Sequence, residues 1–312
     1  MAFFWYLSVM KRLANVLAVD GGGTKTVAAL FDVAGQELAR CRVGPANLYR
    51  DPVAGLATIM AAWQQACTLV GLSPAEAAPR TVISAGLAGA SGEAQRHAYA
   101  AAFPDFAARR LSGDGYTAFV GAFGRQPGSM LSIGTGIVAF HRPIGGAAEG
   151  LSGWGFPVAD RGSGAWLGFR LAAEYLDHLD GAAIIAESIL YARAEAVLGR
   201  ARDGLLSWLA AARAAEFAAF APAVVEAARD GDPLGQALLD EGGAHLLRLA
   251  RALDPSPQAP LCLGGGLADV YRARLETAFA AAVLPASRKP DPIHGAWLVA
   301  TGEVPPEYPD VV

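Results

Sequence analysis

Cysteine is scarce in this sequence, and its scarcity excludes two kinds of site. The 312 residues contain three cysteines, Cys41, Cys67 and Cys262, which lie far apart and form no CxxC pair. A zinc site or a disulfide framework needs closer or paired spacings. We therefore expect three separate reduced thiols, as in a cytoplasmic protein.

An excess of positive charge is also lacking. The formal net charge is −4, the isoelectric point is near 5.8, and no stretch interleaves aromatic with basic residues. Proteins that bind nucleic acid normally carry a basic patch. We therefore expect no nucleic-acid partner.

Long hydrophobic runs are missing, although 53% of the residues are hydrophobic. No apolar run reaches the roughly 20 residues of a membrane-spanning helix. The apolar stretch 2–9 is short, and its basic residues Lys11 and Arg12 follow it, which does not fit a secretory signal. We expect residues 1–12 to be an N-terminal extension, with Met10 as an alternative start, and a cytoplasmic protein without membrane contact. Length and composition suit a well-buried α/β enzyme of two domains.

Glycine, in contrast, is abundant, and three glycine turns each follow an apolar strand. The turns are 21–23, 134–136 and 264–266. Glycine lets backbone N–H groups approach an anion, so such turns can hold phosphate, although a purely structural bend has the same pattern. Neither GxxxxGK[ST] nor a complete GxGxxG before a helix is present. A nucleotide site here is therefore neither a P-loop nor a simple Rossmann unit.

The order of expected elements begins twice with strand, glycine turn and strand. The first part predicts strands at 16–19, 26–31 and 36–44, a helix at 51–72, a strand and glycine loop at 80–92, and a strand, loop and helix at 109–124. The second part predicts a hairpin at 128–142, a Gly/Trp loop to 166, Ala-rich helices over 167–253, a strand, turn and helix at 259–284, and a last helix at 291–303. The hairpins favour mixed sheets with an antiparallel start.

Five motifs together resemble a known family. VDGGGTKT, GDGYTA, SIGTG, GWGFPVADRGSGAWLG and CLGGGLAD follow one another between about Leu13 and Gly302. In this order they resemble the BadF/BadG-like N-acetylglucosamine kinase family of the actin, hexokinase and Hsp70 superfamily. The resemblance implies an α/β fold of two ribonuclease H-like domains with mixed sheets flanked by helices and an interdomain cleft. We expect an N-terminal domain at 13–121, a C-terminal domain at 122–304 and a tail at 305–312.

The resemblance implies that ATP and Mg²⁺ are bound. Asp20 would hold Mg²⁺ through water, or cap the turn, and Lys25 would neutralise phosphate charge, or be a solvated turn lysine. The residues whose backbone would contact ATP are Gly22, Gly23 and Thr24 in the first turn, Gly134, Thr135 and Gly136 in the second, and Gly264, Gly265 and Gly266 in the third.

A kinase that acts on an alcohol needs a group that accepts the hydroxyl proton. Asp114 matches the base of the family, and it is also a candidate N-cap of the following helix; both roles are compatible. The resemblance assigns the sugar to Asn47, Ala88, Gly89, Asp114, Trp154, Gly155, Asp160 and Gly164. The alternative role of Trp154 is that of an aromatic residue in the core, and the alternative role of Asn47 is that of a turn residue.

Two positions depart from the family pattern. Arg161 follows Asp160 where many relatives have an acidic residue, so it either changes the field beside Asp160 or faces solvent. His294 stands where a carboxylate is common, and we interpret it as structural.

The resemblance predicts an ATP-dependent amino-sugar kinase that phosphorylates the 6-hydroxyl of N-acetylglucosamine or glucosamine. The alternative is an activator ATPase, which couples ATP hydrolysis to electron transfer in a partner dehydratase or reductase through a cysteine-bound iron–sulfur cluster. The three cysteines do not suit that cluster. A sugar-sensing regulator would need a DNA-binding segment, for which the N-terminal extension is too short. The expected partner is a small-molecule sugar, and a homodimer is compatible with the sequence.

Overall fold

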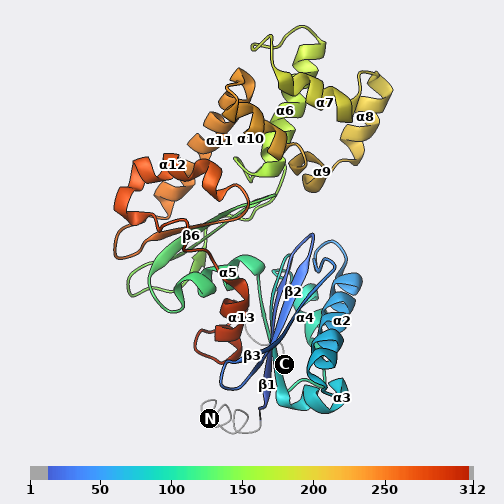
Figure 1. The fold of residues 1–312 in the computed structure, drawn as a ribbon, viewed down its shortest axis with the longest axis vertical. Coiled ribbons are helices and arrows are strands. Elements are labelled where there is room, and N and C mark those ends of the chain that lie inside the picture. Colours follow the sequence, from blue (N-terminus) through green and yellow to red (C-terminus); the bar gives the residue numbers. More distant parts are fainter. Residues whose placement is uncertain (1–12, 309–312) are drawn as a thin grey trace. The chain divides into compact units, whose positions relative to one another are not determined.

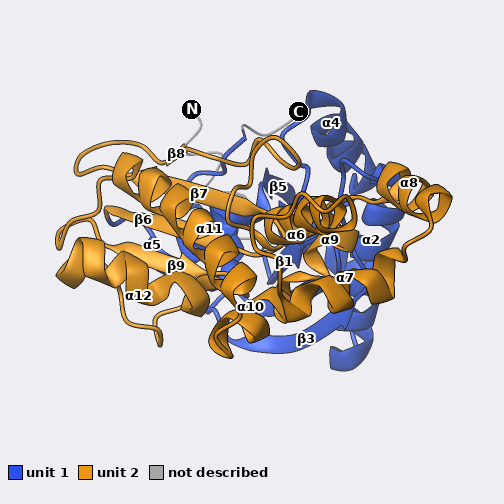
Figure 2. Cartoon of the chain, turned by 90° about the horizontal axis from the view of Figure 1, so that it is seen from above, with its two compact units in different colours: residues 1–126, 290–312 blue, residues 127–289 orange. Residues whose placement is uncertain are grey.

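The computed structural model describes residues 13–308, so the expected N-terminal extension and the end of the expected tail lie outside the described residues. Figure 2 shows two compact units, which among the described residues are 13–126 with 290–308 (unit 1) and Pro127–Lys289 (unit 2). The chain first passes from unit 1 to unit 2 between Gln126 and Pro127, close to the expected boundary between residues 121 and 122. The segment from Pro290 onward differs from the expectation, because it belongs to unit 1 and not to the C-terminal domain.

Unit 1 is built on a five-stranded sheet with the order β3-β2-β1-β4-β5. Its strands are β1 (Asn15–Gly21), β2 (Thr26–Asp32), β3 (Glu37–Val43), β4 (Thr81–Leu87) and β5 (Ala108–Ser112). β1, β2 and β3 pair antiparallel, and β4 and β5 run parallel to β1. The predicted mixed sheet with an antiparallel start is confirmed.

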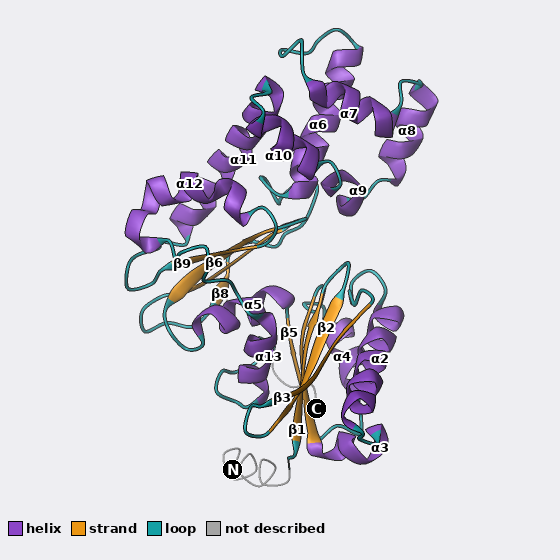
Figure 3. Cartoon of the chain, in the orientation of Figure 1, coloured by secondary structure: helices purple, strands orange, loops and turns teal. Residues whose placement is uncertain are grey.

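Both faces of this sheet are covered by helices. Leu17 and Val19 of β1 join the core under α2 (Pro52–Val70), while Ala18 joins Ile293 and Ala296 of α13 (Pro292–Ala300) on the other face. This follows from the alternation of side chains along a strand. Figure 3 shows α4 (Glu93–Ala102) on the α2 side and α5 (Asp114–Phe123) beside α13. The short α3 (Pro74–Ala77) and η1 (Ala78–Arg80) lead into β4.

The crossing of α5 and α13 explains why the C-terminal helix returns to unit 1. A side chain at Gly121 would overlap the backbone of Asp291, and one at Gly295 would overlap the carbonyl of Thr117. The two helix backbones therefore touch, which only glycine permits. Figure 1 shows the result, with α13 beside the sheet of unit 1.

Unit 2 repeats part of this topology in a four-stranded sheet with the order β8-β7-β6-β9. The strands are β6 (Gly128–Ile133), β7 (Ile137–Arg142), β8 (Glu149–Gly150) and β9 (Leu261–Gly264). β6 and β7 form an antiparallel hairpin, and β9 is parallel to β6. The hairpin with a parallel neighbour matches β2-β1-β4, so the predicted repetition of strand, glycine turn and strand is confirmed.

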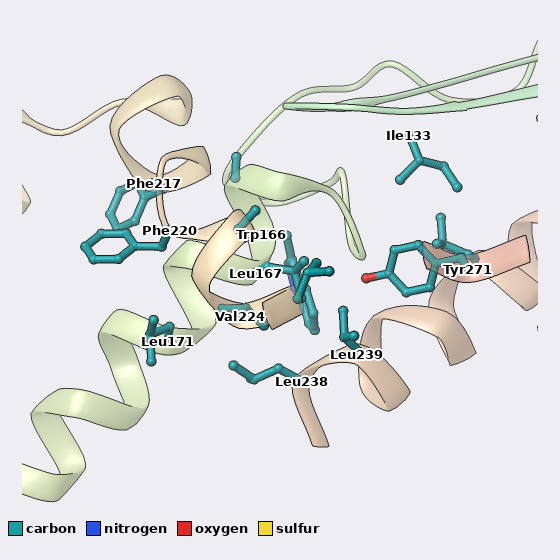
Figure 4. Close-up of a cluster of buried hydrophobic side chains, with 14 of the residues drawn as sticks. Ile133, Trp166, Leu167, Leu171, Phe217, Phe220, Val224, Leu238, Leu239 and Tyr271 are labelled. Atoms are coloured by element: carbon teal, nitrogen blue, oxygen red, sulfur yellow. The ribbon is translucent and has the colours of Figure 1, made fainter. Parts of the chain in front are cut away.

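Helices form the rest of unit 2 and enclose its core. They are α6 (Gly164–Leu179), α7 (Ile189–Leu198), α8 (Arg202–Ala211), α9 (Ala214–Ala218), α10 (Ala221–Arg229), α11 (Pro233–Ala252), α12 (Ala268–Phe279) and the turn η2 (Ala280–Ala282). Figure 4 shows how Trp166 and Leu167 of α6 pack with Val224 and Leu239, while Tyr271 of α12 directs its hydroxyl toward them. Burial of each large apolar side chain contributes about 1.5–3 kcal/mol.

Three helices begin at an Asp-Pro pair. The aspartate accepts a backbone N–H of the first turn at Asp51 (2.9 Å), Asp232 (2.8 Å) and Asp291 (3.0 Å). The proline that follows needs no hydrogen-bond partner at this position. These pairs fix the starts of α2, α11 and α13.

One helix of the described residues, α2, is long and apolar enough to cross a membrane by length and composition, which the sequence analysis did not predict. The bent pair formed by Arg202–Ala211 and Ala214–Arg229 passes the same test. In α2 the buried residues, among them Ile59, Trp63 and Cys67, belong to the core of unit 1. Its apolar composition is therefore also that of a helix covering a sheet.

Candidate active site

The first glycine turn is the tip of the β1–β2 hairpin. Gly21 pairs with Thr26, and the N–H of Gly22 donates to the carbonyl of Lys25 (3.0 Å) to close the turn. Gly23, Thr24 and Lys25 are exposed, and a Cβ added at Gly23 would meet nothing within 4 Å. The turn thus presents its backbone at the end of a buried strand, which an anion-binding turn requires.

Asp20 lies in β1 directly before this turn, in surroundings that disfavour its negative charge. Burial, together with the charges of Asp114 and Asp291, raises the pKa of Asp20 to about 6, although the charge of Lys25 lowers it. A carboxylate in such surroundings is stabilised by a nearby cation. The same interactions show that Asp20 lies close to Asp114.

Three parallel strands of unit 1 end at one edge of the sheet. β1, β4 and β5 are parallel, and Asp20, Ala88 and Asp114 lie at or just after their carboxyl ends. The N–H of Ala88 donates to the carbonyl of Gly21 (2.8 Å), which holds the segment after β4 beside the first turn. In open α/β sheets, ligands bind at this edge.

Asn47 reaches the same edge from the loop after β3, where it forms a bridge with Ala88. Its Oδ1 accepts the N–H groups of Tyr49 and Arg50 at 3.0 Å each. Gly89 has a φ of +76°, and a Cβ there would lie 2.5 Å from Tyr49 and 3.0 Å from Asn47 Oδ1. Asn47 therefore acts as a turn residue, which was the alternative to a sugar-binding role. Its amide nitrogen is the group that can donate to a ligand.

Asp114 is the first residue of α5, and Gly113 is the N-cap. The predicted N-cap role of Asp114 is therefore wrong; instead its Oδ1 accepts the N–H of Gly115 (2.9 Å). The carboxylate lies in the first helical turn, where the helix dipole favours negative charge. Burial nevertheless raises its pKa, which makes it a stronger base than an exposed aspartate.

In unit 2, Asp160 lies against the second glycine turn. The N–H of Gly134 donates to the carbonyl of Gly136 (2.9 Å), and Asp160 Oδ1 accepts the N–H of Ile137 (3.2 Å). A Cβ at Gly136 would lie 2.7 Å from Asp160 Oδ2. Burial raises the pKa of Asp160. The residue assigned to the sugar by resemblance thus contacts the turn assigned to phosphate.

The third glycine turn adjoins the second. Gly264 pairs with Ser132, and the N–H of Leu267 donates to the carbonyl of Ile133 (2.9 Å). Gly265 has a φ of +83°, and a side chain there would overlap the backbone of Ile133. The fold therefore brings Gly134, Thr135 and Gly136 together with Gly264, Gly265 and Gly266 at one edge of the unit 2 sheet.

The loop between β8 and α6 carries the remaining predicted residues. Trp154 is 89% exposed, so the alternative of a core aromatic is wrong. Gly155 has a φ of +86° and open space around it. Gly164 is the first residue of α6, and a Cβ there would lie 3.3 Å from Gly134 O and 3.4 Å from Ala221 Cβ. Its small size allows α6 to begin at the second turn.

The two departures from the family pattern lie on the surface. Arg161 is exposed. Burial lowers the pKa of His245, and the charges of Arg248 and Arg161 lower it further. His294 is exposed and stacks on Trp297, with ring centroids 5.9 Å apart. Arg161 thus faces solvent near His245, and His294 has a structural contact.

The cysteines fit the expectation of separate reduced thiols. All three are free and buried. Burial raises the pKa of Cys41, and it raises the pKa of Cys67 and of Cys262 to about 11. Thiols of this kind are unreactive.

A metal ion at this site would have few protein ligands. Among residues 13–308, no group of three or more His, Cys, Asp or Glu side chains is arranged to hold one. Asp20 offers one carboxylate whose charge is poorly compensated. This fits Mg²⁺, which keeps several waters and needs only one or two carboxylates beside phosphate oxygens.

Two carboxylates near the edge of the unit 1 sheet were not predicted from the sequence. Asp291, the N-cap of α13, raises the pKa of Asp20. Glu307, in the expected tail, accepts the N–H of Gly113 (2.7 Å). An Asp-Pro pair marks the start of α13, but it does not show what that helix packs against. No local pattern marks Glu307, because its partner lies far away in the sequence.

Known proteins are similar to this chain in sequence and in fold. A curated glucosamine kinase of Vibrio cholerae is 29% identical over 253 residues, which are 81% of this chain and 85% of the relative. A structure from Chromobacterium violaceum assigned as an N-acetylglucosamine kinase is 32% identical, with a TM-score of 0.80, and the match covers 93% of this chain and 99% of the other. A similar structure from Porphyromonas gingivalis has the same fold, with a TM-score of 0.68 at 20% identity, and the match covers 93% and 100% of the two chains.

The family assignment rests on most of the chain and on all three glycine turns. The model of the BadF/BadG/BcrA/BcrD ATPase family matches residues 17–300. This range includes Asp20, Asp114 and, apart from Asn15 and Val16, the strands of both sheets, so the resemblance expected from the five motifs is confirmed. The protein is a member of the BadF/BadG/BcrA/BcrD ATPase family and has the α/β fold of the actin and hexokinase type.

Proposed function

We propose that this protein is an ATP-dependent kinase of an amino sugar, which transfers the γ-phosphoryl group to the 6-hydroxyl of glucosamine or N-acetylglucosamine. The observation that carries the proposal is the position of Asp114. Its half-buried carboxylate lies at the sheet edge that also carries Asp20, the first glycine turn and Asn47. The kinases of glucosamine and N-acetylglucosamine among the relatives support the class of substrate.

ATP is the phosphoryl donor in this proposal. The backbone of Gly22, Gly23 and Thr24 binds its terminal phosphates, and the exposed Lys25 supplies positive charge beside them. Asp20 is the residue that would hold Mg²⁺ through water. The metal ion, when bound, neutralises charge on the phosphate oxygens and relieves the unfavourable charge of Asp20.

In unit 2, the proposed contacts of ATP are the second and third glycine turns. A cavity of about 470 Å³ lies beside the first turn of α12, lined by residues of α10, α11 and α12. Its apolar wall residues are Val225, Ala228, Leu239 and Val270, and its polar or charged ones are Arg229, Gln236, Asp240, Asp269 and Arg274. The apolar side chains suit the faces of a purine base and the polar groups suit its nitrogen atoms, so the cavity is our candidate for the adenine of ATP.

Asp114 acts as the general base on the sugar. Its carboxylate accepts the proton of the 6-hydroxyl while that oxygen forms its bond to the γ-phosphorus, and ADP leaves with the electrons of the broken P–O bond. The raised pKa of Asp114 favours this transfer, because the base then holds the proton more firmly. Asn47 binds a sugar hydroxyl through its amide nitrogen, beside the backbone of Ala88 and Gly89.

The loop before α6 supplies the remaining proposed sugar contacts. Trp154 offers an exposed indole face, which suits the apolar side of a hexose. Gly155 leaves open space beside it. Asp160 has one oxygen bound to Ile137 N–H, and it can accept a sugar hydroxyl with the other oxygen.

A coupled assay of ADP release over a panel of hexoses and hexosamines tests the proposal. We expect release with glucosamine or N-acetylglucosamine and a fall in kcat of about 10²–10⁴-fold in Asp114→Asn, because general-base catalysis contributes that much. Asp105→Asn, at an exposed loop position, is the matched control and should keep the wild-type rate. Product analysis by NMR identifies the phosphorylated oxygen.

Two results would contradict the proposal. Undiminished phosphorylation by Asp114→Asn would remove the base. Absence of sugar-dependent ADP release, together with a cluster band in the visible spectrum of anaerobically purified protein, would favour the activator ATPase. We expect no such band, because all three cysteines are buried and separate.

A further inference from the structure

We propose that Glu307 is a positioning residue for Asp114, acting from the C-terminal segment that follows α13. The inference rests on the proposed function, because it takes Asp114 as the base. It assigns a role to a residue outside the five sequence motifs.

Glu307 binds the residue directly before Asp114. Its Oε2 accepts the N–H of Gly113 at 2.7 Å, and Gly113 is the N-cap of α5. A hydrogen bond from a backbone N–H to a carboxylate is charge-assisted and stronger than one between neutral groups. A Cβ at Gly113 would lie 3.0 Å from the same oxygen, so the fit around Gly113 is close.

The segment that carries Glu307 is fixed on both sides of it. Its own N–H donates to Ser112 Oγ (3.2 Å), and Tyr116 donates its hydroxyl to the carbonyl of Pro305 (2.9 Å). After Glu307, the guanidinium of Arg96 lies 5.1 Å from the ring centroid of Tyr308. Glu307 is therefore held against the start of α5 and is not a free residue of a tail.

These contacts bear on the geometry of the base. Gly113 has no side chain of its own to hold the turn between β5 and α5, and glycine has more backbone freedom than other residues. Glu307 and Ser112 bracket this turn through side-chain and backbone groups. Rotation at Gly113 would move the carboxylate of Asp114, and a displacement of about 1 Å at a reacting group costs up to roughly 10²-fold in rate.

The two carboxylates also interact through their charges. Burial raises the pKa of Glu307, the hydrogen bonds from Gly113 and Tyr308 lower it, and the charge of Asp114 raises it. The hydrogen-bond donors around Glu307 thus allow a second acidic group to lie beside the base.

Two substitutions separate the positioning role from general stability. We expect Glu307→Ala to lower kcat about 10- to 100-fold while KM for sugar and for ATP stays within about twofold, because Asp114 is displaced and the other binding residues are untouched. Glu307→Gln keeps an oxygen that accepts the Gly113 N–H and should recover most of the wild-type kcat. Glu303→Gln, at an exposed position of the same segment, is the control and should match the wild type.

Thermal unfolding of each variant shows whether the fold is kept. If Glu307→Ala does not fold, Ser112→Ala replaces it, because this variant loses only the acceptor for the Glu307 N–H and should lower kcat at unchanged KM. A wild-type kcat in the folded Glu307→Ala or Ser112→Ala variant would overturn the inference, as would a Glu307→Gln variant as slow as Glu307→Ala. A wild-type protein that phosphorylates no sugar would instead refute the proposed function.

Discussion

At the scale of single residues, Asp20 links the binding of a cation to the pH dependence of stability. The pKa of Asp20 is raised to about 6 in the folded protein, so the folded state binds this proton more firmly than the unfolded state. The stability that protonation provides is complete below about pH 4 and is lost as the pH rises through about 6. At neutral pH the ionised carboxylate therefore destabilises the fold.

We predict that Asp20→Asn is more stable than the wild type at pH 8, by about 1–3 kcal/mol in the free energy of unfolding. The difference should disappear below about pH 4, where Asp20 is protonated in the wild type as well. Urea denaturation at both pH values measures it. The same variant should lose most of its kinase activity, since it lacks the group proposed for Mg²⁺. Equal stability of the two proteins at pH 8 would contradict the buried, poorly compensated charge.

The sequence predicted single residues where a motif surrounds them. Asp20 and Asp114 stand in glycine-flanked motifs at strand ends, and the structure places both at the carboxyl edge of the parallel strands of unit 1. The contact of Asp160 with the second turn depends on a backbone with a φ of +60°, which no sequence pattern specifies. Glu307 was missed because its role comes from a contact between distant parts of the chain.

At the scale of elements, the crossing of α5 and α13 depends on two glycines. We predict that Gly295→Ala lowers the free energy of unfolding by about 3 kcal/mol, because its Cβ would overlap the carbonyl of Thr117 and force the helices apart. Gly204→Ala is the matched control. That glycine also lies inside a helix, is exposed and has nothing within 4 Å of an added Cβ.

The control should change stability in the opposite direction, by about 0.5–1 kcal/mol, because alanine has the higher helix propensity. Thermal and urea denaturation of the two variants give the comparison. Tolerance of Gly295→Ala would show that the helices do not touch as described.

Elements were predictable where the pattern was local. The glycine turns between apolar strands predicted both hairpins, and the helices predicted at 51–72 and 291–303 correspond to α2 and α13. The partner of α13 was not predictable in the same way. Its apolar face shows that it is buried, but the pattern of a helix does not say which sheet covers it.

At the scale of the whole molecule, the two units differ in how the chain builds them. Unit 2 is one continuous segment, Pro127–Lys289, with its own core. Unit 1 needs both ends of the chain, because α13 covers Ala18 and Ala29 on one face of its sheet.

We predict that a fragment of residues 127–289 folds by itself and unfolds cooperatively, as seen by circular dichroism. A fragment of residues 13–289, which lacks α13, should show the cooperative transition of unit 2 only. A second transition in the longer fragment would show that unit 1 does not depend on its last helix. A point variant such as Gly295→Ala should leave the transition of unit 2 unchanged in the full chain.

Because α13 packs on unit 1, this unit cannot be completed during synthesis until the last helix of the chain has been made. Synthesis proceeds at roughly 5–20 residues per second, so making unit 2 takes on the order of 10–30 s after the last strand of unit 1 has emerged. Throughout that interval the face of the nascent sheet that carries Ala18 and Ala29 is not yet covered by α13. The part of the protein that is begun first is completed last, and the exposed face is where a chaperone would bind the growing chain.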